Sequence, residues 1–350
     1  MENTHLISMF IAAALLLLAF LMGFVASRTT LCTVRAVDEI LFRRRATLLF
    51  SFVQVMLWVV AISMVFEWLF GRSASTPAHF ALQPQSLVGG LIFGIGAALN
   101  GGCSLHTLIR LGSGDFAMAI SIAGLTCGAL LCKLLYWSSN VIDPVGIVAT
   151  FSLEQVLAPE SQQIVVLICG LWMLLMLGFA LLSLFRASRG LTLAQCKTRV
   201  LVGKYSLSTA ALLLGLGNGL LFVLAGTWMY THTLVQGLTN WVFADSTLSQ
   251  PLSPLLWWLM LALLAGIIFS AKLNHSFHWV IKPELKWLSY FLAGNLMGFG
   301  ATLIPGGNDT LILNAIPGLS PHALPAYLSM LVGVSIVLLI RKTAHSSFAS

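Results

Sequence analysis

Long apolar stretches alternate with short polar segments along the chain, and nine of these stretches predict membrane-spanning helices. A helix needs about 20 apolar residues to cross the hydrocarbon core of a bilayer. The third and sixth stretches are shorter than this, and short, glycine-interrupted segments at matching places indicate broken helices at a transport site. The nine stretches are Leu6–Val25, Leu48–Phe70, Leu87–Leu99, Phe116–Trp137, Ile164–Phe185, Ser208–Leu224, Leu255–Ala271, Trp287–Ile304 and Ala323–Ile340.

The composition supports an all-α polytopic membrane protein. The 350 residues are 58% hydrophobic and only 8% charged, whereas soluble domains are about 25% charged. A soluble enzyme, a disordered protein and a nucleic-acid-binding domain are therefore excluded. The six cysteines fit no disulfide framework, because Cys127, Cys132 and Cys169 fall inside apolar stretches, where thiols pack as small hydrophobes. No metal-spaced Cys/His pair and no nucleotide-binding loop occurs, so we expect no cofactor.

The basic residues predict the orientation, since cytoplasmic loops of membrane proteins carry an excess of Lys and Arg. Nine spans place 16 of the 18 basic residues on one side, and Arg72 and Lys133 on the other. We therefore expect a protein of the bacterial inner membrane with a periplasmic N-terminus and a cytoplasmic C-terminus. Met1–His5 carries no Lys or Arg, so the first stretch is predicted to remain as a helix and not to be cleaved as a signal peptide. The 16 are Arg28, Arg35, Arg43, Arg44, Arg45, Arg110, Arg186, Arg189, Lys197, Arg199, Lys204, Lys272, Lys282, Lys286, Arg341 and Lys342.

Two glycine-rich stretches resemble each other and predict an internal repeat. Residues 94–103 (GIGAALNGGC) parallel residues 298–308 (GFGATLIPGGN), with one extra residue in the second copy. Each copy ends the third helix of a four-helix set, and a single helix separates the sets, so the second set is inverted in the membrane. Chance similarity between glycine-rich helices is the alternative. The expected parts are a first repeat at 1–140, a linker helix and cytoplasmic loop at 141–205, and a second repeat at 206–350.

The first copy carries a candidate site at Cys103. Gly101 and Gly102 precede this thiol, and residues 104–111 read as a helix of two turns that is too short to span. We interpret it as a re-entrant half-helix from the cytoplasmic side. Cys103 then lies at a helix N-terminus, where free N–H groups attract anions and a thiol is accessible to a ligand. The alternative is a buried cysteine in a tight turn.

The second copy predicts a matching half-helix that enters from the other face and ends at Pro317. Gly306 and Gly307 precede it, and Asn308 or Asp309 is a good N-cap. A direct ligand role for Asn308 and a role only in capping are both open.

The loop after the first helix holds a second thiol. Arg28 and Arg35 flank Cys32, where they attract an anion or form a structural ion pair with an acid such as Glu39. The matching loop of the second half, residues 226–233, offers hydroxyl groups and His232 in place of the thiol.

At these residues the chain resembles the YeeE/YedE sulfur-transport family, membrane proteins that take up thiosulfate. Arg28 and Cys32 match its first motif. The second motif is a series of spaced glycines that ends in a cysteine, and it is matched by Gly89, Gly90, Gly94, Gly96, Gly101, Gly102 and Cys103. The resemblance covers residues 20–116 and 286–320, and it implies nine helices, inverted halves and thiols that pass a sulfur anion along a path. This chain departs from the family at two places. The thiosulfate carriers have a third cysteine where this chain has Asn308, and they have a basic-acidic pair after the first cysteine where this chain has Asp38-Glu39.

The resemblance and the thiols together predict an inner-membrane transporter for a small sulfur-containing anion, with Cys103, Cys32, Asn308, Arg28 and the two glycine pairs at its site. Neutral thiols donate weak hydrogen bonds to such an anion. A thiolate would instead attack a sulfur–sulfur bond and leave a persulfide, so a membrane sulfurtransferase is one alternative. A non-transporting scaffold for a soluble sulfur carrier is another. The expected partners are the anion, the lipid bilayer and a cytoplasmic sulfur carrier or rhodanese, and no nucleic acid.

Overall fold

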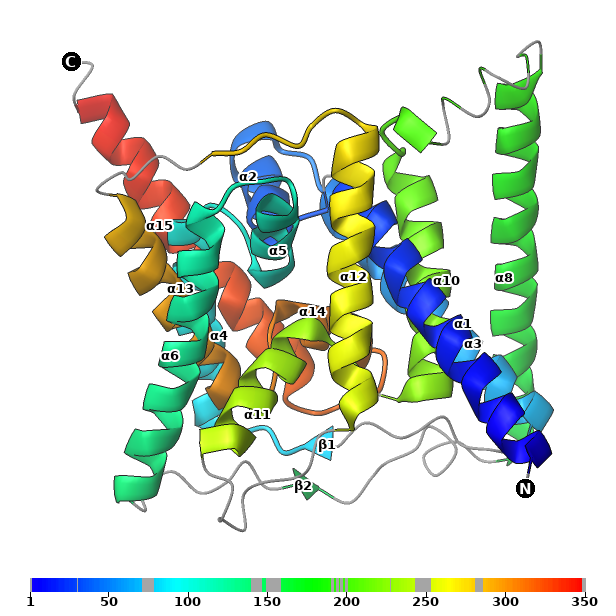
Figure 1. Ribbon diagram of the computed structural model, residues 1–350, viewed down its shortest axis with the longest axis horizontal. Coiled ribbons are helices and arrows are strands. Elements are labelled where there is room, and N and C mark those ends of the chain that lie inside the picture. The colour runs from blue at the N-terminus through cyan, green and yellow to red at the C-terminus, as the bar shows by residue number, and fades with distance from the viewer. Residues whose placement is uncertain are drawn as a thin grey trace.

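The computed structural model describes residues 2–29, 31–70, 79–139, 147–148, 159–189, 192, 195, 198, 201–226, 228–242, 253–280 and 286–347. Within these ranges the chain is almost entirely helical, with one antiparallel ladder of two residues between β1 (His79–Phe80) and β2 (Ile147–Val148). The helices run between two faces, and the chain termini lie at opposite faces (Figure 1). The predicted all-α membrane fold is confirmed.

Nine long helices coincide with the nine predicted stretches. Eight segments are long and apolar enough to cross a membrane, and the third of them, Pro84–Gly112, includes the short helix that follows α4. The ninth helix, α13, forms with the short helical segment after it a pair bent by 43°. The long helices are α1 (Glu2–Ser27), α3 (Thr47–Phe70), α4 (Pro84–Asn100), α6 (Ala117–Ser139), α8 (Pro159–Ser188), α10 (Leu207–Ala225), α12 (Pro254–Leu273), α13 (Lys286–Leu303) and α15 (Ala323–Ser347).

Shorter helices lie between the long ones. Two were predicted: α5 (Ser104–Gly112), and the segment made of α14 (Asn308–Thr310) with a π-helix at Leu311–Ala315. Two more, α2 (Thr33–Arg43) and α11 (Tyr230–Val242), occupy segments that the sequence reasoning assigned to loops, and that assignment is wrong. A helix forms in α2 because it buries one face through Thr33, Val34, Ala36 and Val37 while Arg35 faces outward. Figure 1 shows α2 and α5 near one face and α11 towards the other.

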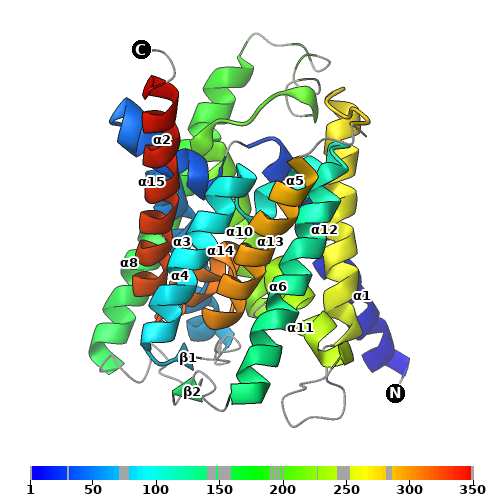
Figure 2. The same ribbon diagram turned by 90° about the vertical axis from the view of Figure 1, so that its left-hand side faces the viewer.

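Glycines bring the long helices into backbone contact. On α13, a Cβ atom at Gly298 would lie 1.8 Å from the carbonyl oxygen of Leu125 on α6, and one at Gly294 would lie 2.0 Å from that of Ser121. Gly94 on α4 has the same relation to α15, and these four helices stand side by side in Figure 2. Small residues serve this purpose in membranes because they allow backbones to approach closely. The third and sixth stretches are thus continuous helices, and the break lies after α4, at residues 101–103.

The two halves of the chain interleave. Helix α6 packs against α13 as α15 packs against α4, and α1 packs against α12 as α10 packs against α3. The α4–α13 and α1–α10 pairs join the halves directly, whereas α8 packs beside α3 at the edge. An inverted repeat predicts such exchanged partners. The repeat and the division at residues 140 and 205 stay predictions, although α6 ends at Ser139 and α10 begins at Leu207.

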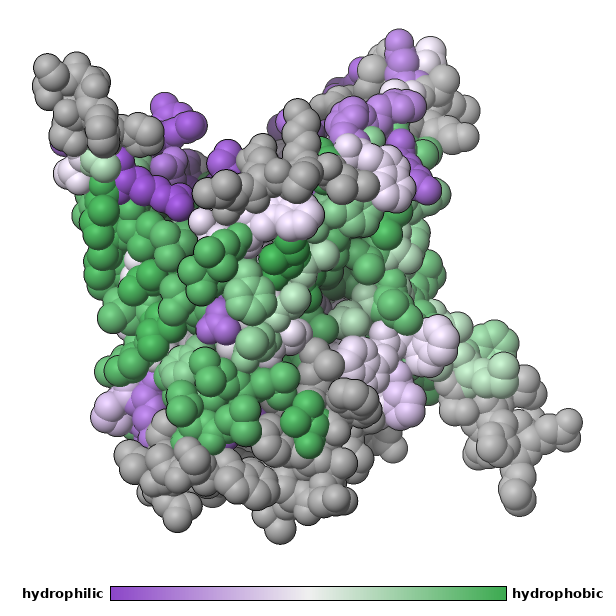
Figure 3. Space-filling view, turned by 60° about the vertical axis from the view of Figure 1, so that its left-hand side comes forward, coloured by the Kyte–Doolittle hydropathy of each residue, from purple (hydrophilic) through white to green (hydrophobic). Residues whose placement is uncertain are grey.

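Basic side chains gather at the face that carries the C-terminus. In the described part of the chain every Lys and Arg except Lys133 belongs to this end of the helices, and hydrophilic residues concentrate there above an apolar band (Figure 3). Four basic residues of the predicted charge pattern lie outside the described residues: Arg72, Lys197, Arg199 and Lys282. The charge separation within the described residues follows the predicted pattern.

Candidate functional site

The turn between α4 and α5 places Cys103 at a helix N-terminus, as expected. Cys103 is the N-cap of α5, and its carbonyl accepts the backbone N–H of Thr107 at 3.0 Å. Gly101 ends α4 with φ 77°, a left-handed conformation that favours glycine. The amide of Asn100 braces the turn by donating to the Gly102 carbonyl at 3.3 Å and to Thr107 Oγ1 at 2.7 Å. The Cys103 thiol is thereby fixed at the start of the half-helix.

A second cysteine meets Cys103 from a distant part of the sequence. Cys32 is the N-cap of α2, so both thiols stand at helix N-termini. The two side chains lie within hydrogen-bonding reach of each other, both cysteines are free, and both are buried. The backbone N–H groups and dipoles of two helices therefore converge on one pair of sulfur atoms.

Asn308 joins this region from the second half of the chain. It is the first residue of α14, and Gly307 occupies the N-cap position, so the prediction that Asn308 or Asp309 is the cap is wrong. The side-chain oxygen of Asn308 accepts a hydrogen bond of 2.9 Å from Thr33 Oγ1, which directly follows Cys32. The amide side chain of Asn308 is thus oriented by α2, the helix that carries the first thiol.

The second glycine pair makes room for side chains. Gly306 has φ 140°, a conformation that favours glycine. A Cβ atom at Gly307 would lie 2.6 Å from Thr231 Cγ2 and 2.8 Å from Asp309 Oδ1. In the first pair, a Cβ atom at Gly102 would lie 2.4 Å from the imidazole of His106. The contacts of Gly102 and Gly307 are therefore with protein atoms, and their absent side chains permit close packing around the site.

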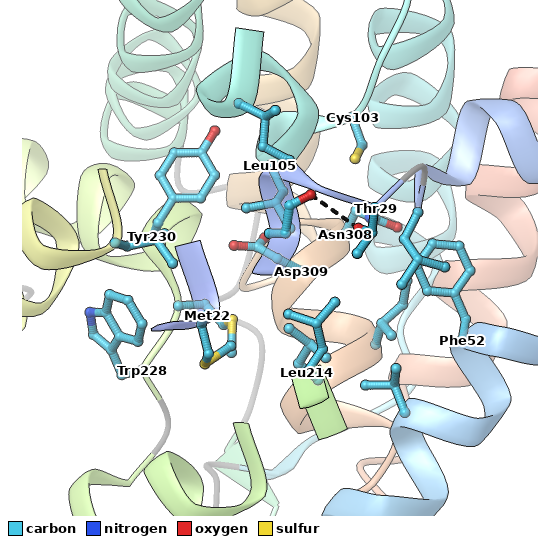
Figure 4. Close-up of a pocket in the computed structure, with 18 residues that line it drawn as sticks. Met22, Thr29, Phe52, Cys103, Leu105, Leu214, Trp228, Tyr230, Asn308 and Asp309 are labelled. Atoms are coloured by element: carbon cyan, nitrogen blue, oxygen red, sulfur yellow. Dashed lines mark hydrogen bonds between the residues drawn. The ribbon is translucent and has the colours of Figure 1, made fainter. Parts of the chain in front are cut away.

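A cavity of about 60 Å³ lies beside the thiols. Its polar edge includes Cys103, Asn308 and Asp309, with Tyr230 on α11 close by (Figure 4). The rest of the wall is mostly apolar. The lining residues are Met22, Ala26, Thr29, Leu31, Phe52, Val55, Cys103, Leu105, Ile109, Leu214, Trp228, Met229, Tyr230, Leu263, Asn308, Asp309, Ile312 and Leu313. Of the predicted site residues, Cys103 and Asn308 border this space. Cys32 is next to Cys103 but is not one of the lining residues.

Arg28 has a structural environment. Its Nε donates to Ser270 Oγ at 2.8 Å, its Nη1 donates to the Gly203 carbonyl at 3.3 Å, and its guanidinium stacks over Phe24. Burial lowers the pKa of Arg28 from its usual value. The alternative of an ion pair with Glu39 is not seen, because that carboxylate accepts hydrogen bonds from the start of α3 instead. Arg28 thus ties α1 to α12 and to the loop before α10, and a contact with the anion stays a prediction.

A polar network missed by the sequence reasoning connects the two half-helices. Tyr230 Oη donates to the Ser104 carbonyl at 2.5 Å, and Thr231 Oγ1 donates to Ser104 Oγ at 3.0 Å. The backbone N–H of Thr231 donates to Asp309 Oδ2 at 3.2 Å. His106, one helical turn after Cys103, is electrostatically coupled to Cys32 and was also missed. Its spacing of three residues from Cys103 is the signal that places both on one helix face.

The site offers hydrogen-bond donors and thiols, and no group of three or more His, Cys, Asp and Glu side chains among the described residues is arranged to hold a metal ion. The sequence model of a protein family described as sulphur transport matches residues 28–336. No curated protein matches the chain. The matched range covers both thiols and every residue that lines the cavity except Met22 and Ala26, and it includes residues of both halves of the fold, so the resemblance noted from the motifs is confirmed. The chain belongs to the YeeE/YedE sulphur transport family of membrane proteins.

Proposed function

We propose that this membrane protein takes up a small sulfur-containing anion, thiosulfate or a related compound, along a path that passes Asn308, Cys103 and Cys32. The family and the apolar helices make it a multi-pass membrane protein of sulfur transport. The observation that carries the finer proposal is the meeting of two free thiols at two helix N-termini beside a cavity.

Neutral thiols and positive helix ends suit such an anion. An S–H group donates a weak hydrogen bond that a soft sulfur atom of the substrate can accept, whereas a thiolate would repel a dianion. The N-termini of α2 and α5 favour negative charge between them. Asn308 supplies an amide where thiosulfate carriers have a thiol, so we infer that contact at Asn308 is non-covalent and that only Cys103 and Cys32 handle sulfur chemically.

The test is uptake of radiolabelled thiosulfate by cells without their own uptake systems, with sulfite, sulfide and selenite as competitors. We expect Cys103→Ala to abolish uptake and Cys32→Ala to weaken it strongly. Cys127→Ala, which changes an exposed thiol on the outside of α6, is the matched control and should retain uptake. Normal uptake by Cys103→Ala would refute the site assignment.

A sulfurtransferase is the second candidate, and the adjacency of the two thiols favours it. In that reaction the Cys103 thiolate would attack the outer sulfur of thiosulfate, the sulfur–sulfur bond would break, and sulfite would leave from a Cys103 persulfide. Mass spectrometry of the protein after exposure to thiosulfate separates the candidates, because transport by hydrogen bonding leaves no added sulfur. The scaffold hypothesis predicts neither uptake nor a persulfide, only association with a sulfur carrier or rhodanese.

We also propose that the basic face is cytoplasmic, in the inner membrane of a bacterium. The positive-inside rule supports this assignment, since nearly all described basic residues lie at the face of the C-terminus. A reporter enzyme that works only in the cytoplasm should be active when it is fused to the C-terminus. Activity only of a fused reporter that works in the periplasm would refute the proposed orientation.

A further inference from the structure

Asp309 is a buried carboxyl group on the wall of the cavity. The residue is 4% exposed and lies between Tyr230 and Phe52 in the close-up of the cavity (Figure 4). Its Oδ2 accepts the backbone N–H of Thr231 at 3.2 Å. Its Oδ1 is buried and has no hydrogen-bond partner among the residues that the structure describes. One carboxyl oxygen is therefore held in place, and the other is available to a proton.

The described residues that line the cavity around Asp309 supply no positive charge. No Lys, Arg or His is among the described residues that line the cavity. The titratable groups there, apart from Asp309, are the Cys103 thiol from α5 and the Tyr230 hydroxyl from α11. Tyr230 donates its proton to the Ser104 carbonyl and not to Asp309. The walls contributed by α1, α3, α10, α12 and the π-helix are apolar at this point. A carboxylate here has no counter-charge from the described lining of the cavity, and such ionisable groups within membranes are typical of proton relays.

The same position makes the carboxyl sensitive to an anion. Asp309 follows Asn308 directly, and both border the cavity with Cys103. A carboxylate at this place repels an anion that approaches the thiols, whereas a protonated carboxyl does not. The anion and the proton therefore favour each other's binding, which is the requirement for coupling two fluxes.

We propose that Asp309 is a proton-binding site and that the protein co-transports protons with its anion. The proton enters from the side of the anion, binds the free carboxyl oxygen, and leaves to the other side with the anion, so the carboxylate is restored in each cycle. This inference rests on the proposed uptake of a sulfur-containing anion.

The experiment uses the full-length protein in liposomes with radiolabelled thiosulfate. The first measurement is exchange of external against internal thiosulfate at equal pH, which tests transport alone. The second is net uptake with the outside one pH unit more acidic, together with a proton-sensitive dye inside. At equal pH we expect exchange. Under the pH gradient we expect proton influx that requires thiosulfate, and accumulation of thiosulfate that rises up to about tenfold per coupled proton for one pH unit.

Three variants assign the effect. Asp309→Asn keeps the shape and the acceptor for Thr231 but cannot release a proton, so exchange should persist while the response to the pH gradient disappears. Asp309→Glu should retain that response. Asp38→Asn, a carboxyl change on α2 outside the cavity, is the matched control and should respond as the parent does.

The outcomes separate this inference from the proposed function. Absence of exchange by the parent would refute uptake and the coupling together. Exchange without any effect of the pH gradient would refute coupling and leave uptake intact. A full pH response in Asp309→Asn, or loss of exchange along with that response, would overturn the role given to Asp309.

Discussion

A charge placed at Asn308 is the sharpest perturbation of the proposed path. In Asn308→Asp the new side chain keeps an oxygen that accepts from Thr33 Oγ1, so the contact between α2 and α14 can be retained. The residue is 4% exposed, so water screens the new charge poorly. An anion between the thiols and this residue would meet a like charge where the parent offers an amide donor.

The magnitude follows from Coulomb's law. Two unit charges ~6 Å apart at an effective dielectric constant of ~20 repel each other by about 3 kcal/mol. A loss of ~1.4 kcal/mol is tenfold in affinity, so we expect the KM for thiosulfate to rise by about 100-fold for each substrate charge that is felt. The loss should shrink at acidic pH, because protonation of the new carboxylate removes its charge.

Initial rates of radiolabelled thiosulfate uptake, normalised to the protein in the membrane, measure this effect. Asn308→Cys should keep uptake or shift preference towards thiosulfate. Asn308→Leu should lose it, and it should also cost about 1–3 kcal/mol of stability, because the buried Thr33 hydroxyl loses its acceptor. Asn274→Asp, the same chemical change in the loop after α12, is the control and should leave KM unaltered. An unaltered KM in Asn308→Asp, or equal uptake by Asn308→Leu and the parent, would refute the role of Asn308 on the proposed path.

Three further predictions concern the frame around the site. Gly102→Ala should destabilise the protein by about 1–3 kcal/mol and slow uptake, because the added methyl group meets the His106 imidazole, whereas Gly170→Ala has open space and should do neither in thermal unfolding and uptake assays. Arg28→Gln should cost about 1.5–3 kcal/mol in unfolding through lost contacts with α12, and an unaltered KM in the folded fraction would mark Arg28 as structural. Hydrogen bonds from the hydroxyl and amide at the start of α3 lower the pKa of the Glu39 carboxyl, so its stabilisation is present above ~4.3 and is lost as the pH falls through the lowered value. Unfolding of Glu39→Gln measured across this range should lack that component. A pH profile identical to that of the parent would show that the Glu39 carboxylate does not stabilise the start of α3.

The local pattern of the chain determined the spans. Each of the nine long helices follows from an apolar run, because a segment in lipid must satisfy its own backbone hydrogen bonds and expose apolar side chains. The half-helix after Gly101 was also predictable, since its length and its glycines are local features. Cys103 at the N-terminus of α5 follows from the same short stretch.

Tertiary structure decided the neighbours of those residues. The meeting of Cys32 with Cys103 and the hydrogen bond from Thr33 to Asn308 join segments from different parts of the chain, and no local period encodes such contacts. The helix α2 depends on burial of one face against helices from elsewhere, so its polar residues read as a loop. The isolation of Asp309 from positive charge likewise arises only when several helices close around it. Sequence periodicity specifies which face of a segment is apolar, whereas the fold specifies which other segment covers it.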